Sequence, residues 1–410
     1  MKTVYKNIKQ LIGAYDSPAG LLEGAAMAAA PMTGNAFLIV KDGVVEKFGG
    51  MDSLSDADVD DATVEDLSGQ FVFPAFADSH THIVYAGSRE QEYEDKIRGL
   101  SYVEIARRGG GILNSADLLR RTSENDLYEM AMERLMRCVE GGTGAIEIKS
   151  GYGLSTGSEL KMLRVIHRMK ETAPVAVRSN FLAAHAFPRE FADDHDGYVS
   201  LIVGEMLPEV AKEGLADFVD VFCDEGFFTI QQTERILAAA SKYGMRPKIH
   251  ANELARSGGI QLGVKYGALS VDHLEHTGDE EIAALRGSGT VATVLPGAAF
   301  FLGMPYAPAR QMVDCGLPVA VASDYNPGSS PSASMKFVLS LASIKMKLSP
   351  VEALNAATVN GANAMGLGGS HGQIVPGWKA NFIITKPMPS FAYFSYAYTE
   401  NLIEKVVVNK

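Results

Sequence analysis

Hydrophobic and polar positions follow one pattern at the two ends of the chain and another in the middle. Near the N-terminus, short apolar runs are separated by turn signals, as in NAFLIVKDGVVEKFGG, where Asp42 and Gly43 lie between two strand-like runs. Such runs on either side of an Asp-Gly pair predict a β-hairpin. The far end is similar, since HGQIVPGWKANFIIT and LIEKVVVN predict strands with a turn at Pro376-Gly377. We therefore expect both ends to join in one small β domain.

The middle of the chain alternates strand-sized apolar runs with segments of helical period, which predicts βα units and a parallel sheet. Helices are expected, for example, over 157–171 and 229–244, and the second of these ends at a glycine. Eight strands are expected, at 71–77, 143–149, 176–184, 217–222, 245–250, 269–273, 290–295 and 318–323. Eight such repeats favour a closed barrel over an open sheet.

The predicted fold is therefore α/β, a (β/α)8 TIM-type barrel with a small composite β-sandwich domain built from both termini. A barrel uses roughly 250 residues, so that a barrel and a smaller domain account for a chain of 410 residues. The predicted bounds are 1–70 for the N-terminal part of the small domain, 71–365 for the barrel and 366–410 for the C-terminal part of the small domain.

Polar side chains capable of chemistry stand at the C-terminal end of nearly every predicted strand. In a (β/α)8 barrel this edge is the active-site face. We therefore expect these side chains to converge although they are far apart in the sequence. They are His80, His82, Lys149, His185, Asp224, His250, His273 and Asp324.

Four of these residues predict a metal site. In DSHTH (78–82), His80 and His82 are two apart and point the same way if the segment is extended. His250 ends the fifth predicted strand, and Asp324 ends the eighth, which lies beside the first in a closed barrel. Three imidazoles and one carboxylate suit one divalent ion, Zn2+ or Fe2+, with a position left for water. Such an ion lowers the pKa of bound water to about 7, which makes hydroxide available at neutral pH.

Two further side chains are candidates for proton transfer. Glu253, three residues after His250, is placed to take or deliver the proton of the attacking water. His273 is placed to polarise a substrate carbonyl. Glu253 has an alternative reading as an acid favoured by a helix N-terminus, and His273 as a fifth ligand or an orienting partner of another group. We predict Glu253, His273 and the metal ligand Asp324 as the catalytic residues.

Composition and charge narrow the class of protein. Apolar residues make up 47% of the chain and charged residues 21%, as in globular domains. The net charge of −12 and the absence of a basic run argue against nucleic acid as a partner, and an anionic substrate would need a cation inside the pocket. No apolar run is long enough to predict a membrane span, and no signal peptide is evident. Three widely spaced cysteines without a CxxC fit the reducing cytoplasm, where we expect the protein to act.

Longer motifs carry a resemblance to a known family. They are DSHTHIVYAGSREQEYEDKIRGLSYVEIARRGGGI, EIKSGYGLSTGSELKMLRVI, FLAAHAFPREF, DVFCDEG, KIHANEL and SDYNPGSSPS. Together they resemble the imidazolonepropionases, a family of the amidohydrolase superfamily, and the likeness runs through most of residues 70–370. The SGYGL and SDYNPG segments are its most specific parts.

The resemblance implies hydrolysis of 4-imidazolone-5-propanoate to N-formimino-L-glutamate, in histidine degradation, by attack of a metal-bound hydroxide on the ring amide. It implies that Arg89 binds the substrate carboxylate, which would supply the cation that an anionic substrate needs. Tyr152 and His185 would line the ring pocket, and Glu253 would also contact the substrate. From the last strand's loop, the residues that would contact substrate or product are Asn326, Gly328 and Ser329.

Several alternatives stay open at this stage. A deaminase of a heterocycle on the same scaffold would use the same metal ligands, and a non-catalytic metal-binding barrel would have a saturated coordination shell. The glycines at 109–111 are either the hinge of a lid or a flexible loop. Lys149 is expected to form an ion pair or a site contact and not a metal bridge. A homodimer is expected.

Overall fold

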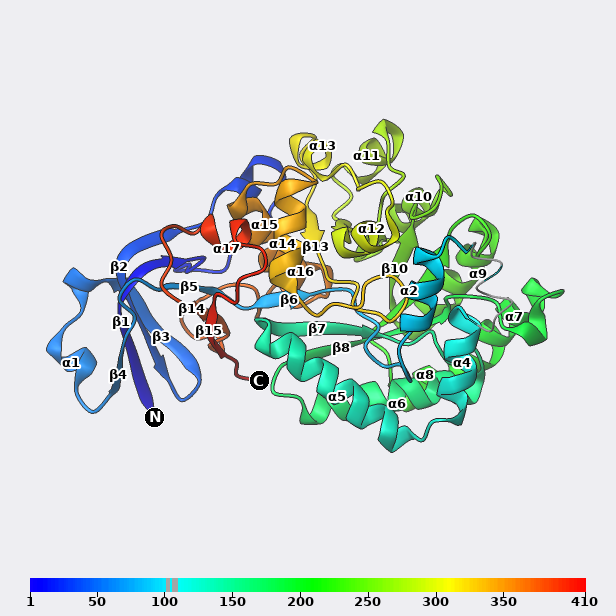
Figure 1. The fold of residues 1–410 in the computed structure, drawn as a ribbon, viewed down its shortest axis with the longest axis horizontal. Helices are drawn as coiled ribbons and strands as arrows, with labels where there is room; N and C mark the ends of the chain where they lie inside the picture. The colour runs from blue at the N-terminus through cyan, green and yellow to red at the C-terminus, as the bar shows by residue number, and fades with distance from the viewer. Residues whose placement is uncertain (101–103, 105–109) are drawn as a thin grey trace.

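An eight-stranded parallel barrel and a separate seven-stranded sheet lie side by side in the computed structural model, which describes residues 1–100, 104 and 110–410 (Figure 1). Gly109, the first glycine of the predicted hinge, lies outside the described residues. The N-terminus lies on the separate sheet, and the C-terminus lies between the sheet and the barrel (Figure 1). The predicted fold class, a barrel with a sheet domain built from both ends of the chain, is confirmed.

The barrel strands follow one another in chain order, each parallel to the next. They are β6 (Phe76–Asp78), β7 (Thr143–Lys149), β8 (Ala176–Ala184), β9 (Phe218–Cys223), β10 (Arg246–Ala251), β11 (Ser270–His273), β12 (Val291–Val294) and β13 (Val319–Val321). Seven of them lie within a residue or two of the predicted ranges. The first prediction, one strand over 71–77, is wrong, because this segment forms two strands that belong to different sheets.

The separate sheet takes the first of these two strands. Its order is β15-β14-β5-β1-β2-β3, with β4 paired to β1. The strands are β1 (Lys2–Ile12), β2 (Met32–Lys41), β3 (Val44–Gly50), β4 (Thr63–Asp66), β5 (Phe71–Pro74), β14 (Phe382–Thr385) and β15 (Ile403–Val407). Asp42 and Gly43 have φ angles of 51° and 76°, as the predicted hairpin turn between β2 and β3 requires. The chain thus passes from this sheet to the barrel between β5 and β6. The domain bounds 1–70, 71–365 and 366–410 stay a prediction.

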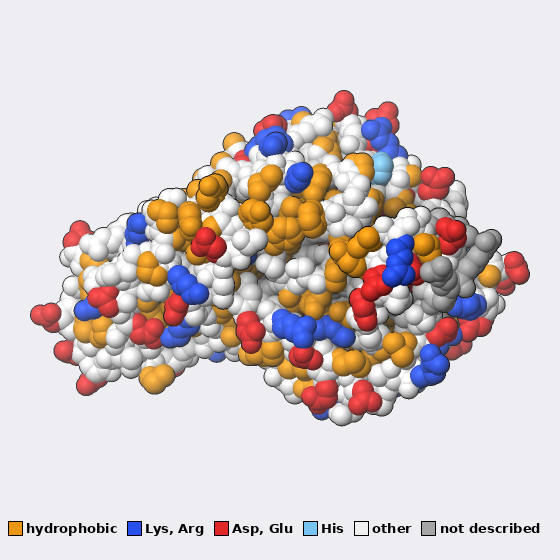
Figure 2. Space-filling model, viewed as in Figure 1, with side chains coloured by type: hydrophobic (Ala, Val, Ile, Leu, Met, Phe, Trp, Pro, Cys, Tyr) orange, Lys and Arg blue, Asp and Glu red, His pale blue; other side chains and the backbone are white. Residues whose placement is uncertain are grey.

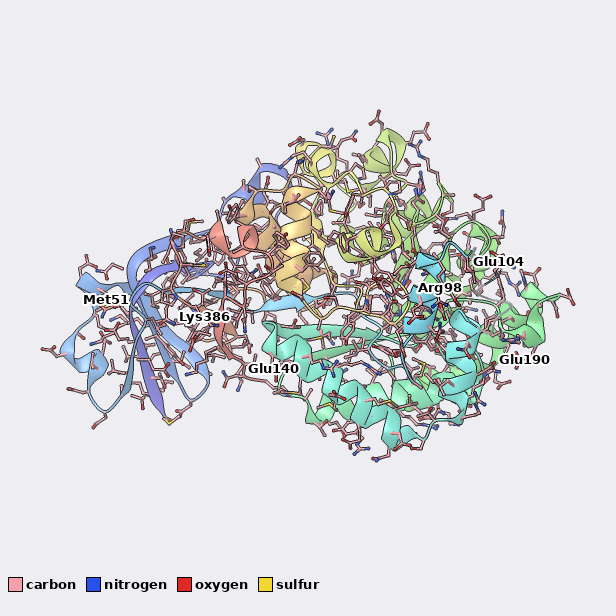
Figure 3. All side chains as sticks on the ribbon, in the orientation of Figure 1. Met51, Arg98, Glu104, Glu140, Glu190 and Lys386 are labelled. Carbon is pink, nitrogen blue, oxygen red and sulfur yellow. The ribbon has the colours of Figure 1, made fainter. Side chains whose placement is uncertain are left out.

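Helices surround the barrel and fill its connections. The predicted helix 157–171 is α6 (Thr156–Thr172), and the predicted helix 229–244 is α9 (Ile230–Ala240) with a 3-10 turn (Ser241–Tyr243) before the left-handed Gly244. The others are α1 (Asp56–Val59), α2 (Glu90–Ile97), α4 (Ile112–Arg121), α5 (Glu124–Glu140), α7 (His195–Leu201), α8 (Leu207–Glu213), α10 (Gly259–Lys265), α11 (Asp279–Leu285), α12 (Pro296–Leu302), α13 (Ala309–Asp314), α14 (Met335–Ile344), α15 (Pro350–Ala357), α16 (Val359–Ala364) and α17 (Tyr393–Tyr396). Figure 3 locates Met51 after β3 on the sheet and Glu140 at the end of α5 on the barrel. Each helix in the described part of the chain is too short or too polar to cross a bilayer.

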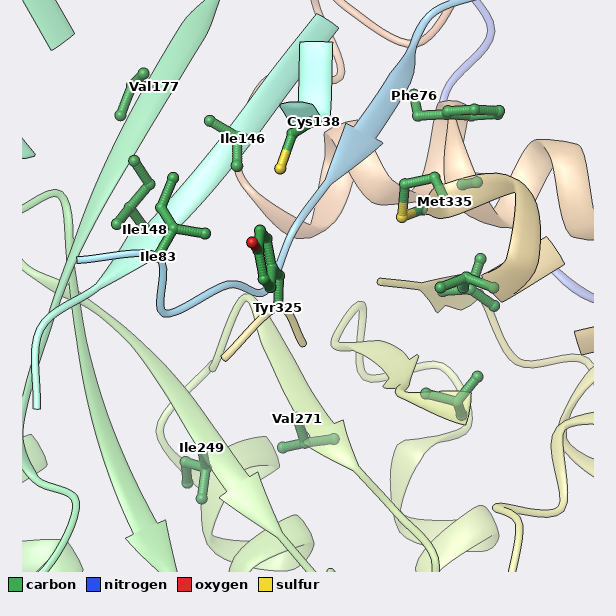
Figure 4. Close-up of a cluster of buried hydrophobic side chains, with 14 of the residues drawn as sticks. Phe76, Ile83, Cys138, Ile146, Ile148, Val177, Ile249, Val271, Tyr325 and Met335 are labelled. Carbon is green, nitrogen blue, oxygen red and sulfur yellow. The ribbon is translucent and has the colours of Figure 1, made fainter. Parts of the chain in front are cut away.

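The barrel closes just beyond the ends of its first and last strands. Asp324 N donates to His80 O at 3.0 Å, and His82 N donates to Tyr325 O at 2.9 Å. Tyr325 is buried, and its ring lies among Ile83, Cys138 and Ile148 in the core (Figure 4). The seam of the barrel therefore brings the HxH segment and Asp324 together and fixes both by backbone hydrogen bonds.

The barrel strands alternate between two environments. In β7, Ile146 and Ile148 belong to the apolar core between strands and helices (Figure 4), whereas Glu147 and Lys149 point into the barrel. The same alternation recurs in β10, where Ile249 lies in the apolar core and Lys248 in the barrel interior. The interior beneath the C-terminal rim is therefore charged, which decides how the site above it is held.

Candidate active site

The C-terminal rim of the barrel gathers the five predicted metal-centre and proton-transfer residues that end strands. His80 and His82 follow β6, His250 lies in β10, His273 ends β11 and Asp324 follows β13. All five side chains are buried. The structure thus brings together residues that are up to 244 positions apart, from His80 to Asp324.

Distances between the candidate ligand atoms fit a bound cation. His80 Nε2 lies 3.2 Å from His82 Nε2, and each lies 3.5 Å from Asp324 Oδ1. Metal–nitrogen bonds of about 2.0–2.1 Å in a tetrahedron put neighbouring ligand atoms about 3.3 Å apart. His250 Nε2 is buried and has no hydrogen-bond partner among the described residues. An acceptor nitrogen left in this way favours a cation at the site.

The donor atoms fall into two overlapping groups that share His80. One group is His80, His82 and His250, and the other is His80, His273 and Asp324, with the ligand atoms of each within 4.8 Å of one another. The second group keeps His273 open as a further ligand. The predicted set of His80, His82, His250 and Asp324 remains a prediction that these distances support.

Two buried aspartates orient the histidines. Asp272 Oδ2 lies 2.6 Å from His80 Nδ1, and Asp220 Oδ1 lies 3.1 Å from His250 Nδ1. A carboxylate on Nδ1 keeps the proton on that nitrogen and turns Nε2 toward the metal. Burial, followed by the charge of Lys149, keeps the pKa of His80 well below its usual value, so the ring is neutral and can bind a cation.

Two buried lysines neutralise the carboxylates below the histidines. Lys149 Nζ donates to Glu147 at 2.6 Å and Asp220 at 2.7 Å, and Lys248 Nζ donates to Glu147 at 2.6 Å. Buried ions are tolerated when they are paired in this way. Burial opposes the charge of Lys149, but Asp220, Glu147 and Asp272 outweigh it and raise its pKa. Lys149 therefore forms ion pairs, as predicted.

Glu253 and His273 form a pair beside the candidate metal site. Glu253 Oε2 lies 3.4 Å from His273 Nε2, and Glu275 Oε2 lies 3.7 Å from His273 Nδ1. Burial raises the pKa of Glu253 to about 7, against the opposing effect of His273. Burial also opposes the charge of His273, but Glu253 and Glu275 outweigh it and raise its pKa to about 10. Glu253 therefore gains or loses its proton near neutral pH, which suits acid–base work.

The segment after β13 is tightly shaped around Asp324, whose φ of 51° is left-handed. Asn326 Oδ1 accepts from the backbone N–H of Gly328 and of Ser329, both at 2.8 Å. Ser329 Oγ lies 3.3 Å from Asp324 Oδ2. These contacts make Asn326 and Ser329 supports of the aspartate. Their predicted contact with substrate stays a prediction.

Arg89 reaches the same segment from the loop before α2. Its Nε donates to Ser115 Oγ at 2.9 Å, whereas its Nη2 is buried and has no hydrogen-bond partner in the part of the chain that the structure describes. A Cβ on Gly328 would lie 2.4 Å from Arg89 Nη1. Gly328 therefore makes room for the guanidinium, in addition to any ligand. A buried guanidinium edge with an unused donor is an anion-binding group.

Tyr152 and His185 stand between Arg89 and the histidines. The Arg89 guanidinium lies 5.9 Å from the centre of the Tyr152 ring, and the Tyr152 and His82 ring centres are 6.1 Å apart. His185 stacks on His82 at 5.2 Å, and its Nδ1 faces Gly151 O at 3.1 Å. Aromatic rings thus lie between the candidate metal site and Arg89, which suits a planar substrate.

Sequence reasoning missed the residues beneath the rim. Four were not singled out, although each contacts a candidate ligand or its partner: Glu147, Asp220, Lys248 and Asp272. The available signal was alternation, since IEIK, KIH, VDV and VDH place a charged residue at every second position of an apolar strand. In a barrel that period points those residues inward.

Comparison with known proteins assigns the family. The amidohydrolase family model matches residues 71–409. An imidazolonepropionase of Flavobacterium johnsoniae is 51% identical over 409 residues, covering 100% of this chain and 99% of that protein. An imidazolonepropionase of Geobacillus thermodenitrificans is 42% identical, covering 99% of this chain and 97% of that protein.

Solved structures of lower identity share the fold. Guanine deaminase of E. coli has a TM-score of 0.72 at 16% identity, covering 99% of this chain and 97% of its own. Guanine deaminase of C. acetobutylicum has a TM-score of 0.69 at 14% identity, covering 100% and 99%. These likenesses show the architecture alone. The family model and the relatives of more than 40% identity over the whole length place this chain in the amidohydrolase family, among the imidazolonepropionases.

Proposed function

We propose that the protein hydrolyses 4-imidazolone-5-propanoate to N-formimino-L-glutamate. The reaction adds one water to the ring carbonyl carbon, breaks the carbon–nitrogen bond of the ring amide and places a proton on the released nitrogen. Membership among the imidazolonepropionases supports this activity. Within the site, the observation that carries the substrate assignment is Arg89, whose buried Nη2 has no partner in the described protein and whose guanidinium lies 5.9 Å from the centre of the Tyr152 ring.

One divalent ion, Zn2+ or Fe2+, would be held by His80, His82, His250 and Asp324. When bound, such an ion lowers the pKa of a coordinated water to about 7 and polarises a carbonyl oxygen. The three imidazoles and one carboxylate of this set suit either metal. Asp272 and Asp220 support the arrangement by holding the Nδ1 atoms of His80 and His250.

Glu253 and His273 would share the proton transfers. In its ionised form, Glu253 accepts the proton of the attacking water and passes it to the ring nitrogen as the carbon–nitrogen bond breaks. His273, 3.4 Å from Glu253, donates a hydrogen bond to the carbonyl oxygen, where negative charge develops. Asp324 contributes by binding the cation and through its contact with Ser329.

The other pocket residues would orient the substrate. Arg89 would receive the propanoate carboxylate, because a guanidinium matches a carboxylate through parallel hydrogen bonds. Tyr152 and His185 would border the imidazolone ring. The segment after β13 would complete the contacts with substrate or product through Asn326, Gly328 and Ser329.

Replacing Arg89 tests the substrate assignment. For Arg89→Met we expect kcat/KM for the imidazolone acid, made in place and followed by its ring absorbance, to fall by about 100-fold, since a charge-assisted hydrogen bond contributes up to about 3 kcal/mol. The matched control is Arg98→Met, because Arg98 is 62% exposed and pairs only with Glu94 among the described contacts. The loss should disappear for a substrate whose carboxylate is esterified.

Three outcomes would contradict the proposed function or its substrate assignment. An Arg89→Met variant with unchanged kcat/KM would remove Arg89 as the carboxylate anchor. Turnover of an aminated heterocycle by the wild type, with none of the imidazolone acid, would favour the deaminase alternative. A wild-type protein that binds metal without any hydrolysis would favour the non-catalytic barrel.

We also propose that two copies form a homodimer. Hydrophobic side chains gather over α14 and α17 on one face (Figure 2). Phe300 on α12, Ile344 on α14 and Tyr396 on α17 are 53%, 52% and 76% exposed. Sedimentation should give about twice the chain mass of 43.9 kDa. Ile344→Glu with Tyr396→Glu should give the monomer mass, and Tyr243→Glu, an exposed tyrosine on α9's 3-10 extension, should leave the dimer intact. A monomeric wild type would refute the proposal.

The cytoplasm is the compartment that we propose. Cys138, Cys223 and Cys315 are free thiols, and the first two are buried. Unpaired thiols of this kind fit a reducing compartment. Fractionation with a C-terminal tag would test this, and recovery outside the cytoplasm would contradict it.

A further inference from the structure

The buried carboxylate of Asp224 holds the loop that carries Glu253. Asp224 follows β9, and its side chain is 4% exposed. Its Oδ2 accepts from Glu253 N at 2.7 Å and Leu254 N at 2.9 Å. Its Oδ1 accepts from Ala255 N at 3.0 Å and from Glu225 N at 2.8 Å. One side chain therefore binds three consecutive amides of a loop that follows the neighbouring strand.

These three amides need the carboxylate because the loop has left the sheet. Asn252 has a left-handed φ of 56°, so the chain turns away from β10 immediately before Glu253. The three N–H groups of residues 253–255 lie beyond the β10 ladder, which ends at Ala251, and all three donate to Asp224. Partly or fully buried donors of this kind must be satisfied. An ionised carboxylate makes shorter and stronger hydrogen bonds to them than a neutral acceptor does.

A second connection fixes the other side of the same turn. Asn252 Nδ2 donates to His276 O at 3.0 Å, and His276 N donates to Asn252 O at 2.8 Å. The loop after β10 is thereby joined to the loop after β11, which follows directly from His273. Glu253 and His273 thus stand on backbones that are tied to each other, and Asp224 supplies the remaining support on the Glu253 side.

We propose that Asp224 is a positioning residue that holds the Glu253 backbone so that the Glu253 carboxylate faces His273 and the ring amide. Asp224 itself touches none of the reacting atoms. The inference rests on the proposed function, in which Glu253 transfers the proton. A proton-transfer group works only within hydrogen-bond reach of its target, and a displacement of about 1 Å costs about 100-fold in rate.

Glu159 provides a matched control, because it does the same for a different loop. This fully buried glutamate of α6 accepts from Gly153 N at 2.7 Å and Leu154 N at 2.9 Å through Oε1, and from Gly151 N at 3.1 Å through Oε2. The loop that it holds carries Tyr152. Replacing one carboxylate oxygen by an NH2 group should therefore disturb the Tyr152 loop in Glu159→Gln and the Glu253 loop in Asp224→Asn.

Amide hydrogen exchange tests the anchoring without any need for activity. In Asp224→Asn an amide NH2 replaces one acceptor, so we expect faster exchange in the segment 253–255, with 151–154 unchanged. In Glu159→Gln we expect the reverse. If protection over 253–255 is the same in Asp224→Asn and in the wild type, the inference is wrong, whatever the enzyme hydrolyses.

Kinetics test whether Asp224 acts through Glu253. We expect Asp224→Asn to lower kcat by about 100-fold with KM changed less than about threefold, because the ground-state contacts remain. Glu159→Gln should mainly raise KM. Added to Glu253→Gln, the Asp224→Asn change should cost little more, since coupled residues are not additive. A full second loss in the double variant would show that Asp224 acts by another route and would overturn the inference.

The proposed function and this inference fail in different ways. If the wild type does not hydrolyse the imidazolone acid, the substrate assignment fails while the exchange experiment still decides the anchoring. If Glu253→Gln keeps full kcat, the proton-transfer role of Glu253 fails, and the inference fails with it. Metal content, measured in every variant, should stay at the wild-type value, because Asp224 contacts none of the candidate ligands in the described part of the chain.

Discussion

Individual residues at the rim owe their properties to burial as much as to their type. Glu253 is an ordinary carboxylic acid by sequence, yet burial raises its pKa to about 7. Burial first, followed by the charge of Lys149 for His80 and by the neighbouring His185 for His82, keeps the pKa of both histidines well below its usual value. Arg89 contacts Ser115 and Glu92 through Nε, and its Nη2 keeps a donor that no described residue uses. The same residue types in water would have none of these properties.

The raised pKa of Glu253 predicts the acid limb of the pH profile. Below about pH 7 Glu253 is protonated and cannot accept a proton, so kcat/KM should fall as pH drops through that value. A bound cation attracts the carboxylate's charge and moves the limb to lower pH. Because the folded pKa lies above the unfolded value, the protonated form favours folding, and this contribution is lost as pH rises through about 7.

A variant at Glu253 tests whether this residue causes the acid limb of the pH profile. Glu253→Gln should lower kcat by about 10²–10⁴-fold and flatten the acid limb, measured as kcat and kcat/KM between pH 5 and 9 (a range of about four units). Wild-type profiles without an acid limb, or a Gln variant that keeps it, would contradict the role of Glu253.

At the scale of elements, helix α16 packs closely against β6, the strand that leads to the C-terminal rim. Gly361 on α16 faces β6, and a Cβ there would lie 2.3 Å from Ala77 O. Ala77 is in the strand that leads to His80. A glycine is therefore needed where the helix meets the backbone of the first barrel strand.

Alanine at this position should destabilise the protein. For Gly361→Ala we expect a loss of about 1–3 kcal/mol in the free energy of unfolding, because overpacking forces the helix from the strand. Gly157→Ala in α6 is the control with the opposite sign, since Gly157 is exposed and a Cβ there would meet nothing within 4 Å. That change should add up to about 1 kcal/mol of helix stability. Equal midpoints in denaturant for the two variants would contradict the packing argument.

At the scale of the whole molecule, the candidate metal centre lies at the seam where the barrel closes. Its candidate ligands come from both sides of that seam and from β10, and backbone hydrogen bonds from Asp324 N to His80 O and from His82 N to Tyr325 O hold the seam together. A bound ion would therefore link the first and last barrel strands as well as serve the reaction.

Metal removal should lower both activity and thermal stability. An ion that binds only the folded state stabilises it by about 4 kcal/mol at a thousandfold excess over its Kd. Exhaustive chelation should thus abolish hydrolysis and lower Tm by several degrees, and added Zn2+ or Fe2+ should restore both. His250→Ala should bind less metal and lose the Tm response, whereas His167→Ala, an exposed histidine, should keep both. A fully active chelated enzyme would rule out the metal centre.

The sequence by itself determined the repeated pattern and the chemistry that the rim carries. Periodicity predicted seven of the eight barrel strands, because each pattern reports a local preference for strand or helix. Imidazoles and carboxylates at strand ends predicted where catalysis would lie, since parallel strands share one edge. Residue identities also predicted the hairpin at Asp42-Gly43 and the ion pairing of Lys149.

Only the tertiary structure decided what surrounds those residues. The run 71–77 divides between two sheets because each half finds a different hydrogen-bonding partner, and no local pattern records that choice. The pairing of Glu147, Asp220, Lys248 and Asp272 beneath the histidines depends on barrel closure, which brings β7 opposite β10. The hydrogen bonds between Asp224 and the Glu253 loop also depend on the barrel, which places β9 beside β10. Contacts between distant segments form only when the whole chain folds, and burial at that point creates the pKa values on which the proposed reaction relies.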